Sequence, residues 1–237
     1  DRYEIVDDKV DYTYPAGSKV LFPRMQDNTQ GRPALYRRWL DKPTGSPNFG
    51  DNIEFFFKYQ LGWMYWRYFM WNFAGRQNGE QGFYSWDPTS GHWVSGFTFV
   101  DEPRIGDQTL LPEWARHNQA HNRYFLIPFF LGLVGMFFHF QRRRLDFAAV
   151  MSLFIITGLG IIVYTNQPPS EPRERDYVLA GSFFTYAIWI GLSVLALYEL
   201  LQRVKLPNAV AGLGATALAL SAPLLMVTQN WDDHSRA

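Results

Sequence analysis

The sequence contains no cysteine among its 237 residues, and 22 Lys and Arg side chains are balanced by 22 Asp and Glu. The lack of cysteine excludes disulfide bonds and leaves no thiol pattern that identifies a redox compartment. A formal net charge of zero provides no bulk attraction to nucleic acid, so we expect no nucleic-acid partner. Walker, Rossmann and Ser-His-Asp motifs are also missing.

Long runs without charge fill most of residues 124–228, which are almost continuously apolar, whereas residues 1–123 hold most of the charged side chains. We therefore divide the chain into a polar region (1–123), a transmembrane region (124–228) and a short tail (229–237). The chain begins at Asp1 without a basic or apolar leader and ends directly after a charged cluster. We expect it to be a segment of a larger membrane protein.

Four apolar runs predict a mainly α-helical, polytopic membrane protein, because a span needs about 20 apolar residues and at least about 17. The first run is the shortest. Glycines inside the second and fourth runs (Gly158, Gly160, Gly212 and Gly214) indicate close packing between helices. The runs are Tyr124–Phe140, Phe147–Tyr164, Val178–Leu201 and Pro207–Thr228.

The short loops between these runs predict the topology. Residues 141–146 contain three arginines, and residues 202–206 contain two cations and no acid. The positive-inside rule places both loops in the cytoplasm. Residues 1–123, the loop 165–177 and the tail then share the outer face, which is the periplasm if the protein lies in a bacterial inner membrane.

Within the polar region, alternating residues predict a β-hairpin over residues 10–22. A short helix is expected near residues 34–40, and an aromatic-rich helix over residues 52–74. Lys58 and Arg67 lie on opposite faces of an ideal helix, which argues against a lipid-facing span. We expect the aromatic helix to lie at the membrane interface or to be buried among other helices.

The loop between the second and third runs contains three prolines and five charged residues: Glu171, Arg173, Glu174, Arg175 and Asp176. The two arginines can hold a phosphate or pyrophosphate through bidentate hydrogen bonds. One of the three carboxylates can act as a general base on a hydroxyl nucleophile. The alternative is a self-neutralising loop of ion pairs that only caps two helices.

The tail offers a second polar cluster, which the topology places on the same face. Asp232, Asp233 and His234 carry oxygen and nitrogen atoms that can bind a divalent cation, and Asp232 is a further candidate base. The simpler interpretation is a hydrated helix exit with Trp231 as an interfacial anchor.

Two weaker patterns remain. His117 and His121 have a spacing that can bind zinc, but no third ligand accompanies them, so solvated residues before a span are the favoured interpretation. Several aromatic residues can stack on sugar rings, although an interfacial belt explains them better. These residues are Trp63, Trp66, Tyr68 and Trp71.

Four strings together resemble a family of large polytopic membrane proteins common in Bacteroidetes, long known only as a domain of unknown function. That family is similar to vertebrate transmembrane O-mannosyltransferases that modify plexin-type domains. The resemblance covers most of the chain, which looks like a central segment of the longer family members. The strings are Leu21–Met25, Gly62–Asn78, Asn166–Phe183 and Gln229–Arg236.

The resemblance implies a glycosyltransferase of the GT-C type, with a polyprenyl-phosphate sugar as donor and a Ser or Thr of an exported protein as acceptor. Such enzymes usually carry their catalytic acid in an outer loop near the N-terminal spans, so the principal base is expected outside this chain. Arg173, Arg175 and the tail would then support binding of the lipid phosphate. The alternative is a non-enzymatic scaffold or a subunit of a transport complex, since every polar cluster also has a structural explanation.

Overall fold

The structure is a computed structural model that describes residues 11, 13, 20–25, 29–45, 47–170 and 176–231, the side chain of Asp176 excepted. The described chain is mainly helical and divides into two compact units, Asp1–Phe56 and Phe57–Ala237. The predicted hairpin over residues 10–22 lies mostly outside the described residues, and its last three residues, 20–22, are irregular.

The first unit contains helices α1 (Arg32–Trp39) and α2 (Phe49–Phe55). Helix α1 confirms the short helix predicted near residues 34–40. Helix α2 begins three residues earlier than predicted, because Asn48 is its cap. The Asn48 side chain accepts a hydrogen bond from the Asp51 backbone, and the Asp51 carboxylate accepts one from the Asn48 backbone. Asn52, where the helix was expected to begin, instead accepts hydrogen bonds from the backbone of residues 24 and 25.

The predicted aromatic helix is present. Helix α2 is followed directly by η2 (Phe56–Arg67), which is π-helical, and by α3 (Tyr68–Phe73). Phe69 and Phe73 are buried and contact the ring of Tyr186 from the third apolar run. Lys58 is exposed and Arg67 is buried, so the two cations have different surroundings. The C-terminal part of the helix is therefore packed against another helix, and its position at a membrane interface stays a prediction.

A small polar subdomain follows α3. Strands β1 (Gly75–Arg76) and β2 (Asn122–Arg123) pair antiparallel, with Gly75 opposite Arg123 and Arg76 opposite Asn122. Arg76 also forms a β-bridge with Trp93. The connection between the strands carries three short helices: α4 (Thr98–Ile105), η3 (Gln108–Leu110) and α5 (Glu113–Arg116).

Within the described residues, three helical stretches are long and apolar enough to cross a membrane: Arg144–Thr165, Tyr177–Arg203 and Asn208–Asn230. They agree with the second, third and fourth predicted runs. The first run forms α6 (Ile127–Arg142), whose 16 residues correspond to about 24 Å, against a hydrocarbon core of about 30 Å. That this first run spans the membrane therefore stays a prediction. The other apolar helices are α7 (Arg144–Ile155), η4 (Ile156–Gly160), α8 (Ile161–Thr165), α9 (Asp176–Arg203) and α10 (Asn208–Asn230).

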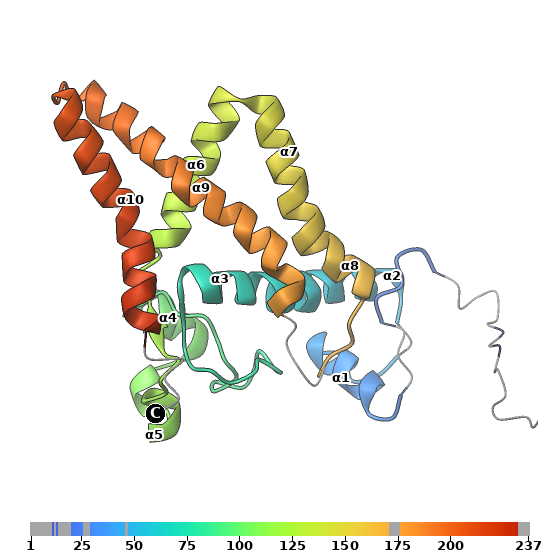
Figure 1. Ribbon diagram of the computed structural model, residues 1–237. Helices are drawn as coiled ribbons and strands as arrows, with labels where there is room; N and C mark the ends of the chain where they lie inside the picture. Colours follow the sequence, from blue (N-terminus) through green and yellow to red (C-terminus); the bar gives the residue numbers. More distant parts are fainter. Residues whose placement is uncertain are drawn as a thin grey trace, which may run out of the picture. The chain divides into compact units, whose positions relative to one another are not determined.

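The helices of the second unit alternate in direction (Figure 1). Helices α6 and α7 form a hairpin, α9 crosses α6, and α10 packs back along α9. The α6–α7 and α9–α10 turns lie at one end of the helices. Helix α3, the polar subdomain, the end of α8 and the end of α10 lie at the other. The segments that lead into both charged clusters therefore lie at the same end of the unit.

Glycines set the distance between α6 and α9. A Cβ on Gly135 would overlap the backbone carbonyl of Trp189, a side chain that is completely buried. Gly158 in η4 also contacts α9, since a Cβ there would lie 2.8 Å from the Ser182 hydroxyl oxygen. By contrast, no described atom lies within 4 Å of the Cβ that Gly212 would carry. The predicted close packing is thus confirmed for Gly158 and not for Gly212. The tightest contact involves Gly135 on α6, for which no close packing was predicted.

Candidate functional site

Most of the predicted site residues lie outside the described part of the chain. These are Glu171, Arg173, Glu174, Arg175, Asp232, Asp233 and His234. The backbone of Asp176 begins α9. What the structure describes is the pair of flanks from which the charged loop (171–176) and the acidic tail (232–234) extend. We call the end of the second unit that carries both flanks the polar end; it comprises residues 75–126, 166–170 and 229–231.

The first flank, residues 166–170, is fixed by side chains distant in sequence. Asn166 ends α8 in a left-handed conformation (φ 43°), which asparagine tolerates better than most residues. Its side-chain oxygen accepts a hydrogen bond of 2.7 Å from the Gln60 amide, and Gln60 is fully buried. The Tyr59 hydroxyl donates to the carbonyl of Pro168 at 3.0 Å. These bonds fasten the approach to the charged loop onto η2.

The last residue of this flank reaches the polar subdomain. The Ser170 hydroxyl lies 3.0 Å from the hydroxyl of Tyr84, and the Tyr84 ring stacks on Trp86 at a centroid distance of 5.1 Å. Pro169 is fully buried. The charged loop therefore begins at a surface that carries two aromatic rings.

The second flank is the end of α10, and Asn230 is its central residue. Its side-chain oxygen accepts hydrogen bonds from Arg76 at 2.7 Å and from Asn122 at 3.2 Å. Its amide nitrogen donates to the Tyr124 hydroxyl and to the Met226 carbonyl, both at 2.6 Å. One amide thereby joins α10 to both strands of the small sheet.

The neighbouring Gln229 extends that sheet. Its side-chain oxygen accepts from the backbone N–H of Arg123 at 2.5 Å, and its amide nitrogen donates to the backbone carbonyl of Arg123 at 2.7 Å. The glutamine amide thus pairs with β2 as a peptide group of a third strand would. Together, Gln229 and Asn230 fix the point from which the acidic tail extends.

Between the two flanks runs a stack of cations and indole rings. The Arg67 guanidinium carbon lies 4.8 Å from the ring centroid of Trp63 and 5.5 Å from that of Trp71. The guanidinium carbon of Arg76 lies 5.4 Å from the same Trp71 centroid. Arg67 is 3% exposed and donates to the Gly91 carbonyl at 2.8 Å. Burial lowers the pKa of Arg67 to about 10, so it remains charged at neutral pH.

Two histidines at this end are neutral near pH 7. Burial lowers the pKa of His92 to about 4, although the Asp87 carbonyl, 2.8 Å from its ring, opposes that shift. Burial also lowers the pKa of His121. The His121 ring contacts the Gln77 carbonyl at 2.8 Å and accepts a hydrogen bond from Arg123 at 3.0 Å, so both ring nitrogens have protein partners.

The described residues hold no cluster of three side chains suited to a metal ion. The polar end as described is therefore a framework of side-chain hydrogen bonds that fixes the two flanks, at residues 166–170 and 229–230. Sequence reasoning missed the amides that build it, Gln60, Asn166, Gln229 and Asn230. Asn166, Gln229 and Asn230 follow the ends of apolar runs, where a polar side chain has no role in spanning lipid, and that place was their signal; Gln60 lies within the aromatic helix and had none.

Comparison with known proteins gives little on function. Residues 1–57, a minority of the 237-residue chain, match a family of unknown function (DUF8416). This match coincides with the first compact unit, Asp1–Phe56, to within one residue. No curated protein and no solved structure matches the chain.

Proposed function

We propose that this chain is a segment of a membrane-embedded, GT-C-like glycosyltransferase. It moves a sugar from a polyprenyl-phosphate donor to Ser or Thr of exported proteins. The observation that carries the proposal is the anchoring of both flanks, at Asn166–Ser170 and at Gln229–Asn230, to the same end of the second unit. A lipid-phosphate donor presents its reacting group at a membrane surface, so the groups that handle it must gather at one end of the helices.

The chemistry assigned to each group follows from its charge. Arg173 and Arg175 hold the phosphate of the donor, because guanidinium groups pair with phosphate oxygens in a bidentate manner. Asp232 and its neighbours in the tail complete the site, either as a base or with a divalent cation. Two half-buried aromatic rings lie beside Ser170, those of Tyr84 and Trp86, and they suit stacking on a sugar ring.

The membrane arrangement belongs to the same proposal. Helix α6 is the short first span, and the aromatic helix that ends at Phe73 lies at the outer interface of a bacterial inner membrane. The α6–α7 and α9–α10 turns, which carry the arginines, face the cytoplasm. A 16-residue span is accommodated by local thinning of the bilayer and by extension of its flanking side chains to the interface.

This topology can be tested with single cysteines, because the chain has none of its own. Leu145 is 87% exposed beside the α6–α7 turn, and Leu110 is 82% exposed in the polar subdomain. In intact cells, a membrane-impermeant maleimide is expected to label the Leu110→Cys variant and to leave Leu145→Cys unlabelled until the cells are opened. Labelling of both variants, or of neither, in intact cells would show that α6 does not cross the membrane.

The sugar-transfer activity is tested in the full-length protein. We expect Arg173→Ala, Arg175→Ala and Asp232→Ala each to lower transfer to an exported acceptor by about 100-fold, since each removes a charged group that acts on the reacting phosphate or hydroxyl. Arg116→Ala serves as the control, because Arg116 is exposed on α5. Transfer is measured as incorporation of labelled sugar into the acceptor, with protein levels checked by immunoblot.

Two results would count against the enzyme. Unchanged transfer in all three variants would overturn the assignment of these residues. Recovery of the protein in a stoichiometric membrane complex, with normal glycosylation in a deletion strain, would support the scaffold or transport-complex alternative instead.

A further inference from the structure

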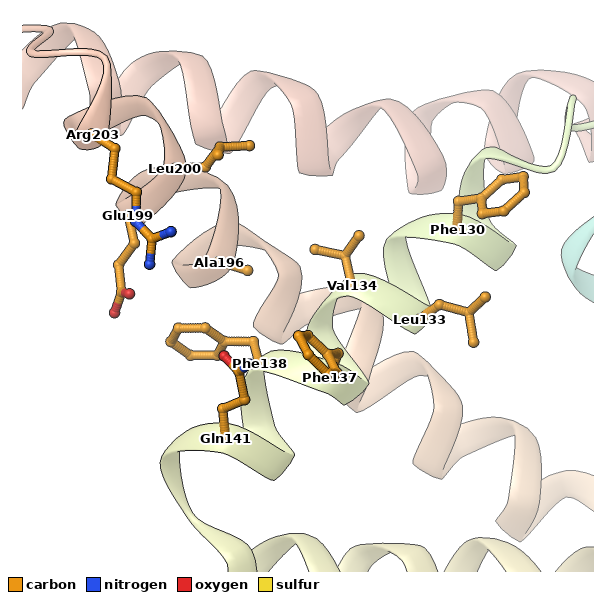
Figure 2. A pocket seen from close by; sticks show the side chains of 10 residues that line it. All are labelled: Phe130, Leu133, Val134, Phe137, Phe138, Gln141, Ala196, Glu199, Leu200 and Arg203. Carbon is orange, nitrogen blue, oxygen red and sulfur yellow. The ribbon is translucent and has the colours of Figure 1, made fainter.

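A groove runs between α6 and α9, from Phe130 near the start of α6 to Gln141 near its end (Figure 2). Its volume is about 380 Å³, and six of its lining residues come from α6 and four from α9. The walls are apolar and partly exposed: Phe137 is 61% and Leu200 is 56% exposed. The lining becomes polar only at the turns, with Gln141, Glu199 and Arg203.

The length of the groove matches one leaflet of a bilayer. Its lining on α6 extends from Phe130 to Gln141, and this separation corresponds to about 16 Å of helix. Half of the hydrocarbon core is about 15 Å thick. If the apolar walls lie beside the acyl chains of one leaflet, the polar lining residues Gln141, Glu199 and Arg203 therefore lie beside the headgroups of that leaflet.

A second pocket of about 380 Å³ adjoins the groove at the headgroup level. The two share Phe138 and Glu199, and the second adds His139, Arg142 and Arg143. The Glu199 carboxylate forms an ion pair with Arg142. Because Glu199 is already paired, Arg143 and Arg203 supply the net positive charge at this level.

We propose that the groove binds one anionic phospholipid, with an acyl chain along α6 and α9 and the phosphate between Arg143 and Arg203. Charge complementarity selects this occupant: an apolar protein helix would leave the two arginines beside an uncharged surface, whereas a phosphate satisfies both. Basic pockets between membrane helices on the cytoplasmic side commonly hold anionic headgroups. The proposal rests on the membrane arrangement proposed above but not on glycosyl transfer, because Arg143 and Arg203 lie at the helix turns, at the end opposite the polar end.

The test is native mass spectrometry of the detergent-solubilised chain, titrated with dioleoyl phosphatidylglycerol or with dioleoyl phosphatidylcholine. We expect one phosphatidylglycerol to bind at least about tenfold more tightly than phosphatidylcholine. The Arg143→Gln and Arg203→Gln variants should each lose roughly fivefold in affinity for phosphatidylglycerol, because one cation near a headgroup contributes about that factor. Their affinity for phosphatidylcholine should not change. Arg116→Gln, at the other end of the unit, is the matched control.

A second variant tests the apolar walls separately from the charges. Ala196 lines the groove and Ala187, on the same helix, is exposed elsewhere. Ala196→Phe should fill the groove and weaken both lipids, whereas Ala187→Phe should weaken neither. Equal affinity for the two lipids, or unchanged affinity in both arginine variants, would overturn the proposal. Displacement of the bound lipid by millimolar inorganic phosphate would show an anion site without a chain-binding groove, and would overturn it as well.

Discussion

Gly135→Ala is expected to lower the free energy of unfolding by about 3 kcal/mol or more and to separate α6 from α9. Overpacking a well-packed core usually costs about 1–3 kcal/mol. Here the added methyl group meets backbone atoms, which cannot rotate away. A Cβ on Gly135 would overlap the Trp189 carbonyl and lie 2.8 Å from the Ser193 backbone nitrogen. The cost is therefore at the upper end of that range.

The separation would also break contacts that depend on the close approach of the two helices. The Tyr186 hydroxyl donates to the Phe129 carbonyl at 2.6 Å, and the Trp189 indole N–H donates to His139 at 3.3 Å. Both bonds join α9 to α6. Their loss would leave polar groups without partners inside a packed interface, which adds to the steric cost.

Gly191→Ala is the matched control, because no described atom lies within 4 Å of the Cβ that it would carry. Replacing glycine by alanine within a helix is otherwise neutral or favourable, by up to about 1 kcal/mol. Unfolding in mixed micelles, followed by helical circular dichroism against denaturing detergent, compares the two variants with the parent chain. Equal stability of Gly135→Ala and the parent would show that α6 and α9 are not packed as described.

The regular parts of this fold could be predicted from the sequence. Apolar runs of sufficient length, separated by charged loops, indicated the helices at 144–165, 177–203 and 208–230. The pattern is local, because a helix in lipid must form its backbone hydrogen bonds within its own segment. No knowledge of distant contacts was therefore needed. The start of α2 was harder, because several neighbouring Asn and Asp residues can serve as caps; the helix begins after Asn48, and Asn52 contacts residues 24 and 25 instead.

The candidate site could be predicted only in part. The charged residues 171–176 and 232–234 were visible as clusters, but the residues that position them were not. Gln60 pairs with Asn166, and Arg76 pairs with Asn230, across more than 100 positions in each case. An isolated amide has the same sequence signature whether it binds water or a distant backbone group. Such pairings depend on the tertiary fold, which composition and periodicity do not encode locally.

The buried stack at the polar end explains why these distant pairings can persist. Arg67 is charged and buried, and its contacts with the rings of Trp63 and Trp71 offset part of the cost of removing it from water. Arg76 continues the stack and ends at Asn230. The end of α10 is thus fastened to this stack. It follows that the position of the tail depends strongly on one amide side chain.

Asn230→Ala is accordingly expected to destabilise the chain by about 2–4 kcal/mol. The alanine removes the partner of Arg76, Asn122 and Tyr124 at once, and the last two are each 2% exposed. A buried polar group that loses its partner costs about 1–3 kcal/mol. Asn230→Asp should have a smaller effect, because its carboxylate still accepts from Arg76 and loses only the donor to the Tyr124 hydroxyl and to the Met226 carbonyl.

The measurement is hydrogen–deuterium exchange of the two strands, together with unfolding in mild detergent. We expect faster exchange at residues 75–76 and 122–123 in Asn230→Ala, an intermediate rate in Asn230→Asp, and no change in Thr228→Ala. Thr228 is exposed, and its hydroxyl bonds within α10 to the Leu225 carbonyl, so its loss leaves the sheet untouched. Unaltered exchange in Asn230→Ala would mean that the strands are held without α10, and Asn230 would then not be the anchor from which the tail extends.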